Sequence, residues 1–310
     1  MTASEQRALV SIALRAAHAD GFNDLSERAA LQRAAASFGA AGIDAAAIES
    51  DIVNRRTTLA ADVAELGTPD ARRLAYEIAV AVTGADGART TVEDTFLAEL
   101  GAALGLPADV TTGFAAQADA VTAAVPATTG GTPTVTTSAA PDPAVLDRQI
   151  VEAAITNAAL ELLPETLATI AIVPLQMKLV YRIGQAYGYE LDAGHAREFL
   201  AALGIGLSGQ LLEQVGRKLL GGLLGALAGG VGRAVGNQAA SSGMAFATTW
   251  AIGKLAVRYY AGGRALDTAK LKAAFGSLFD EAKTLTTRYT GEIQQRAKTI
   301  DVRQLPALLR

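Results

Sequence analysis

The sequence contains no cysteine among its 310 residues. Disulfide bonds, thiolate nucleophiles and thiolate metal sites are therefore excluded, and the chain is compatible with a reducing cytoplasm. Histidine occurs only twice, and His18 and His195 lie far apart with no serine elbow or paired acid–base group near either. No catalytic set is visible, so we expect a protein that is not an enzyme.

Aromatic residues make up only 5% of the chain, and runs of β-branched residues are scarce, which disfavours a β-sheet. Hydrophobic residues nevertheless make up 50% of the chain, and alanine and leucine dominate among them. This composition is typical of helices that pack closely through small side chains. We therefore predict an all-α protein.

Long apolar runs are also missing. None of the uncharged runs (166–177, 199–212, 219–232 and 239–253) reaches the roughly 20 residues that a helix needs to cross a ~30 Å hydrocarbon layer. Simple membrane-spanning helices are therefore not expected, whereas hairpins that enter one leaflet and an ordinary buried core remain as alternatives. Residues 1–17 likewise lack the pattern of a secretory signal peptide.

A nucleotide site is not expected either. Residues 204–209 match the dinucleotide pattern GxGxxG letter for letter, but a helical segment rather than a strand precedes them. Because that pattern needs a strand–turn–helix context, we expect no bound nucleotide. We also expect no nucleic-acid partner.

Composition divides the chain into four parts. Residues 1–118 carry 16 acidic residues, 9 arginines and no lysine, a balance of −7, and should form an acidic helical domain. Residues 119–144, rich in alanine, threonine and proline and almost without charge, predict a flexible linker. Residues 145–263 should form a glycine-rich, apolar domain of helical hairpins. Residues 264–310 should form a basic amphipathic helix and tail.

The pattern A-D-G-x5-E occurs twice in the first part, 66 residues apart, and apolar residues around it recur at the same offset. This predicts an internal duplication of a helix–turn–helix unit. Apolar spacing and capping residues place the helices of this part at roughly 4–18, 25–38, 44–64, 69–83, 91–104 and 107–118.

The acidic residues of the two turns are candidate metal ligands. Carboxylate oxygens suit a hard cation such as Ca²⁺ or Mg²⁺, and the absence of histidine or cysteine beside them argues against zinc. The alternative is purely structural, with the aspartates stabilising turns and the glutamates capping helices. The candidate ligands are Asp20, Glu27, Asp86 and Glu93.

Five glycines follow a regular spacing in the third part. Gly221, Gly225 and Gly229 recur at every fourth position, and Gly232 and Gly236 form a second pair with the same spacing. Such a glycine zipper lets another backbone approach one helix face closely, in a bilayer or in a tight bundle. We therefore predict helix–helix packing and self-association; loose loop structure is the alternative.

The end of the chain is basic, because residues 254–310 carry 11 basic and 5 acidic residues, a balance of +6. Apolar residues recur there at steps of four and three between 271 and 289, as on the seam of an amphipathic helix. Lys270, Lys272, Lys283 and Arg288 flank that seam. A basic segment beside an apolar domain favours contact with anionic lipid head groups. The alternative is an ordinary solvated helix face.

Two family resemblances follow from these motifs. The duplicated unit, over residues 5–118, resembles the tellurite-resistance TerB-like family, an all-helical domain whose acidic turn residues are associated with divalent metal. Residues 155–263 resemble a bacterial domain of unknown function that accompanies membrane-associated GTPases. That second resemblance rests on Leu163-Pro164-Glu165, the segment 173–177, the glycine series and the stretch 249–253.

These features lead to one expectation and one alternative. The first is a non-enzymatic, self-associating protein at the cytoplasmic face of the inner membrane, peripheral or partly inserted. In it the glycine-rich domain contacts lipid and neighbouring subunits, while the TerB-like domain recruits partners or a divalent metal, in the setting of a stress response. The alternative is a soluble adaptor for a GTPase or a stress-response complex.

Overall fold

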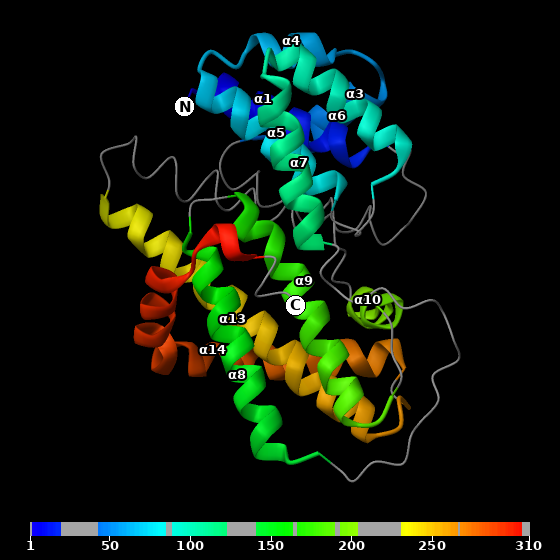
Figure 1. Ribbon diagram of the computed structural model, residues 1–310, viewed down its shortest axis with the longest axis vertical. Helices are drawn as coiled ribbons and strands as arrows, with labels where there is room; N and C mark the ends of the chain where they lie inside the picture. The colour runs from blue at the N-terminus through cyan, green and yellow to red at the C-terminus, as the bar shows by residue number, and fades with distance from the viewer. Residues whose placement is uncertain are drawn as a thin grey trace. The chain divides into compact units, whose positions relative to one another are not determined.

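The computed structural model describes residues 2–19, 43–84, 89–122, 141–163, 166–189, 193–203, 231–265 and 267–305. The regular elements in these ranges are helices, with no strand among them, so the predicted all-α class is confirmed (Figure 1). Contacts divide the chain into two compact units, residues 1–122 with 206–237 and residues 123–205 with 238–310.

The described helices of the first unit follow the predicted repeat. They are α1 (Ala3–Ala17), α3 (Ala45–Val53), α4 (Leu59–Ala64), α5 (Pro69–Thr83), α6 (Thr91–Leu104) and α7 (Ala108–Thr122). Helix α5 begins and ends 66 residues after α1. When the residue numbers of α3 are shifted by the same offset, they fall inside α7. The partner of α6 would be the predicted helix 25–38, which lies outside the described residues.

The two copies meet through their first helices. Helix α1 packs against α5, and the equivalent residues Ile12 and Ile78 are both buried. Helix α1 also contacts α3, as α5 contacts α7. Equivalent contacts in both halves are what a twofold arrangement of duplicated units produces, so the packing agrees with the duplication.

The predicted helix 44–64 is wrong as a single element, because the chain turns at residues 54–58. Arg55 has a left-handed backbone with φ of 54°, and the Thr58 side chain accepts a hydrogen bond from Ala61 N at 3.2 Å, which starts α4 anew. Asp62 on α4 then accepts hydrogen bonds from Ser11 Oγ and Arg15 Nε of α1, each at 2.7 Å. The turn therefore places α4 against α1.

The second unit contains α8 (Pro143–Glu161), α9 (Thr166–Ala186), α10 (Ala193–Ala202), most of α13 (Val231–Ala261), α14 (Thr268–Thr299) and the short 3-10 helix η2 (Val302–Gln304). Figure 1 shows α8, α9 and α13 running alongside one another in this unit. Fully buried Phe246 and nearly buried Trp250 place α13 in the core. The core is therefore made by helices whose sequences read as apolar runs.

Polar side chains connect the three core helices. Thr249 Oγ1 on α13 accepts hydrogen bonds from Asn157 Nδ2 of α8 at 3.0 Å and from Gln176 Nε2 of α9 at 3.1 Å. All three residues are 0% exposed. Because a buried polar group must find its partner, these bonds fix how the helices slide and rotate against one another.

Helix α14 packs on its own unit through the predicted seam. Leu271, Leu278 and Ala282 are buried, and the Tyr289 ring stacks on Phe246 of α13 with 5.3 Å between ring centroids. The helix starts where the Asp267 carboxylate accepts a hydrogen bond from Lys270 N at 2.9 Å. The seam therefore packs against the second unit itself.

The ends of the predicted linker are helical. Helix α7 continues to Thr122 because Ala118 and Val121 are buried, and α8 begins at Pro143 after its Asp142 cap. Residues 123–140 lie outside the described residues, so the rest of the linker stays a prediction.

Candidate functional site

The predicted metal ligands fall mostly outside the described residues. Asp20, Glu27 and Asp86 lie there, and Glu93 is at the start of α6. The Glu93 carboxylate accepts hydrogen bonds from Thr90 N at 2.7 Å and Thr90 Oγ1 at 3.0 Å, which completes a capping box. Among the described residues no group of three or more His, Asp or Glu side chains could hold a metal. Glu93 thus has the capping role of the structural alternative, while metal binding stays a prediction.

The predicted glycine series is described only in part. Gly221, Gly225 and Gly229 lie outside the described residues, and Gly232 and Gly236 fall within the first turns of α13. Close helix packing occurs at two other glycines of α13. A Cβ on Gly253 would lie 2.7 Å from Ile150 Cγ1 of α8, and one on Gly243 would lie 3.3 Å from Thr286 Cγ2 of α14.

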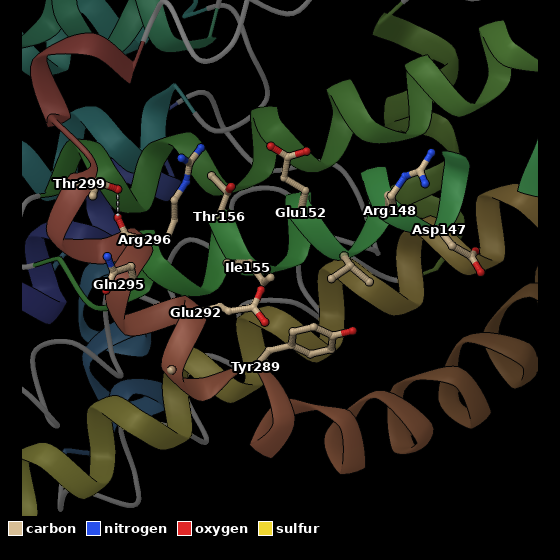
Figure 2. A pocket seen from close by; sticks show the side chains of 12 residues that line it. Asp147, Arg148, Glu152, Ile155, Thr156, Tyr289, Glu292, Gln295, Arg296 and Thr299 are labelled. Atoms are coloured by element: carbon tan, nitrogen blue, oxygen red, sulfur yellow. Dashed lines mark hydrogen bonds between the residues drawn. The ribbon is translucent and has the colours of Figure 1, made fainter. Parts of the chain in front are cut away.

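A groove between α8 and α14 could take a ligand, with a volume of about 930 Å³ (Figure 2). This lies within the range of small-molecule sites. Spacings of three and four residues put the lining side chains on one face of each helix. Val151 and Ile155 of α8 and Tyr289 of α14 supply apolar surface, and all three are half-buried.

The groove also carries charge. It is lined by Arg148 and Glu152 on α8 and by Glu292 and Arg296 on α14. Figure 2 shows the side chains of Arg296, Thr156 and Glu152 pointing to the same side of the groove. At the other end, Asp147 forms an ion pair with Lys254 of α13 at 2.8 Å. The charge of Asp147 is therefore already balanced by the protein.

A smaller pocket of about 190 Å³ adjoins the groove and shares Glu152, Thr156 and Arg296 with it. Helix α9 adds Lys178 and Arg182, which stand four residues apart on one face. Three cationic side chains and one carboxylate therefore line this pocket. Arg182 and Arg296 form no ion pair with any other described residue.

Lys178 is the most buried of these cations, with 8% of its surface exposed. Burial, together with the positive charge of Arg182, lowers the pKa of Lys178 below its ordinary value. An anion in the pocket would offset both effects, because it favours the charged form of the lysine. The pocket is therefore suited to a negatively charged group.

A second polar feature lies in the core behind α8. The amide oxygens of Asn157 and Gln176 and the hydroxyl of Thr169 accept or donate no hydrogen bond among the described residues. Buried acceptors of this kind are typical of places that an internal water completes. Their buried position makes them a structural feature of the helix contacts rather than a surface for a partner.

Sequence reasoning identified neither the groove nor the pocket. The i, i+4 pairs Arg148/Glu152 and Lys178/Arg182 are visible in the sequence, but such pairs usually mark solvated helix faces. Which helix faces meet depends on long-range packing of α8 with α9 and α14. The sequence does not contain that information in a local pattern.

In comparison with known proteins, no family model, curated protein or solved structure matches the chain.

One described helix, α9, is long and apolar enough to cross a membrane by length and composition alone. Of its apolar window, 78% is buried inside the protein. The core helix of a soluble protein passes the same test, so this finding separates none of the alternatives.

Proposed function

We propose that the protein is a non-enzymatic binding protein at the surface of the cytoplasmic membrane. Its second unit contacts anionic lipid and other copies of the chain, and its first unit, a TerB-like domain, recruits partners or divalent metal in a stress response. The observation that carries the lipid contact is the orientation of α14. Its apolar seam faces its own unit, while Lys270, Lys272, Lys283, Arg288 and Lys298 are exposed.

Exposed lysine and arginine side chains can attract anionic lipid head groups without any segment of the protein entering the bilayer. Each lysine or arginine near an anionic membrane contributes about 1 kcal/mol to binding, and this attraction fades within a Debye length. Large apolar side chains are rarely exposed in the described part of the chain, the examples being Val53, Val92, Val145 and Met244. The proposed lipid contact is therefore mainly electrostatic for the described surface.

Vesicle flotation with the full chain tests the lipid contact. The protein should float with vesicles that contain anionic lipid, remain behind with neutral vesicles, and detach as salt is raised. The double variant Lys270→Gln and Lys272→Gln should weaken binding by about 2 kcal/mol. The control Arg7→Gln and Arg56→Gln removes the same charge from exposed positions in the first unit and should have no effect. A full chain that never floats would contradict the proposal.

The metal part of the proposal concerns the acidic turns. A ligand that binds only the folded state raises stability by about 2.7 kcal/mol at a hundredfold excess over Kd. Millimolar Ca²⁺ or Mg²⁺ should therefore raise the melting temperature of the chain, and Asp20→Ala with Asp86→Ala should remove that rise. Unchanged melting with both ions would leave the four carboxylates as turn and cap residues only.

The self-association part rests on the glycine series at 221–236. Light scattering behind size exclusion should show an assembly larger than one chain of 31.7 kDa. Replacing Gly221, Gly225 and Gly229 by leucine should reduce it to the monomer, because the larger side chains keep the helices apart.

A soluble adaptor for a GTPase or stress-response complex is the second candidate. In this candidate the apolar helix α9, of whose apolar window 78% is buried, is part of an ordinary helical core. A full chain that is monodisperse without detergent, fails to float and binds a GTPase would support the adaptor over the membrane protein.

A further inference from the structure

We propose that the groove between α8 and α14 holds a single anionic amphiphile, with its phosphate or carboxylate head in the pocket of Lys178, Arg182 and Arg296. The hydrocarbon chain lies along Val151, Ile155 and Tyr289. The choice of a lipid over a free anion rests on the proposed function, and the inference adds the site and the chemical class of its ligand.

The first step of the argument is the separation of charge from apolar surface. The small pocket collects three cations against one carboxylate, whereas the middle of the groove offers aliphatic and aromatic surface together with the exposed Glu292. The two cavities share Glu152, Thr156 and Arg296, so one molecule can occupy both. A ligand with a charged head and an apolar body matches this order of surfaces.

The second step is the direction of the ligand. At the far end, Asp147 is paired with Lys254, and Arg148 is a single cation among the lining residues there, against the three cations of the small pocket. At the near end, Arg182 and Arg296 have no ion pair with a described residue. Guanidinium groups bind phosphate and carboxylate oxygens in pairs of hydrogen bonds. The head therefore belongs at the end formed by α9 and α14.

The third step is the size of the site. From Asp147 to Thr156 the groove follows α8 for about 14 Å, at 1.5 Å per residue. This length accommodates one medium-length alkyl chain. Gly291 lines the groove on α14, and a Cβ placed on it would meet nothing within 4 Å, so the glycine leaves room for that chain.

The test measures binding of decyl phosphate, below the concentration at which it forms micelles, to the full chain by calorimetry. One molecule should bind per chain. Arg182→Gln with Arg296→Gln should weaken binding roughly tenfold or more, because the paired hydrogen bonds to the head are lost. The matched control, Arg7→Gln with Arg56→Gln, removes two charges from exposed positions in the first unit and should leave the affinity unchanged.

A second variant tests the contact with the hydrocarbon chain of the ligand rather than with its head group. Gly291→Phe places a ring in open space, so it should fold and yet fill the groove. It should weaken decyl phosphate roughly tenfold, the factor that ~1.4 kcal/mol gives, while any weak binding of inorganic phosphate persists. Circular dichroism of each variant checks that it is folded.

Three results would overturn the inference. They are the absence of decyl phosphate binding to the wild type, competition by inorganic phosphate as strong as that by decyl phosphate, and equally tight binding of decyl maltoside. Vesicle flotation distinguishes the failure of the proposed ligand site from the failure of the proposed membrane function. A wild type that floats with anionic vesicles but binds no decyl phosphate rejects the site alone, whereas one that binds decyl phosphate but never floats rejects the membrane function alone.

Discussion

At the scale of single residues, Gly253 determines how closely α13 approaches α8. A Cβ at this position would lie 2.7 and 2.8 Å from the two γ carbons of Ile150 and 3.2 Å from Leu179 Cδ2. Ile150 is itself fully buried, and its β-branched side chain has few rotamers to move into. We expect Gly253→Ala to lower the free energy of unfolding of the second unit by roughly 1–3 kcal/mol, measured by thermal denaturation.

Two further variants separate this clash from the general effect of alanine in a helix. In a double-mutant cycle, Ile150→Ala should offset part of the loss caused by Gly253→Ala, with a coupling energy of about 0.5–3 kcal/mol. Gly276→Ala on α14, where a Cβ meets nothing within 4 Å, should instead stabilise the protein by roughly 0.5–1 kcal/mol. Equal destabilisation at both glycines would show that Gly253 makes no special contact.

At the scale of elements, the duplication predicts that equivalent helices contribute equally. Ile12 of α1 and Ile78 of α5 stand 66 residues apart, and their exposed fractions are 0% and 1%. Ile12→Ala and Ile78→Ala should each cost roughly 2–5 kcal/mol, and the two losses should be similar. Hydrogen exchange of peptides from α1 and α5 reports on both helices, and a large loss for one variant alone would argue against equivalent packing.

The start of α14 should depend on pH. Hydrogen bonds from Lys270 N and from its side chain hold the pKa of Asp267 below its ordinary value of 3.8. Because the folded-state pKa is the lower one, the cap is fully present above the ordinary value and is lost as the pH falls through the folded-state pKa. The amide resonance of Lys270 should shift over that acidic range, and Asp267→Asn should abolish the shift. A resonance that does not move would show that this cap is not formed.

The sequence was a good guide to elements whose signals are local. Thr68 with Pro69 and Thr90 with Glu93 mark the starts of α5 and α6, because caps and an N-terminal proline act within one turn. The turn at Arg55 cannot be predicted in this way, because a single residue with a left-handed backbone does not change the periodic spacing of apolar residues. The groove could not be predicted at all, since residues of α8 and α14 more than a hundred positions apart line it.

At the scale of the whole molecule, charge is unevenly distributed along the chain. The −7 belongs to residues 1–118, which lie in the first unit, and the +6 belongs to residues 254–310, which lie in the second. The acidic and the basic part of the chain therefore suit partners of opposite charge. The first unit would then favour cations or basic partners, and α14 would favour anionic ones.

The prediction of a linker at 119–144 can be tested on the intact chain by limited proteolysis. The segment is rich in alanine and valine, after which elastase cleaves, and contains no long aliphatic pattern that would bury it. Low doses of elastase should therefore cut first between 123 and 140, giving an N-terminal and a C-terminal fragment that resist further digestion. Trypsin is the matched control, because no lysine or arginine occurs between Arg89 and Arg148, so it cannot produce these fragments. Mass spectrometry identifies the ends, and a first elastase cut inside α7 or α8 would contradict the predicted linker.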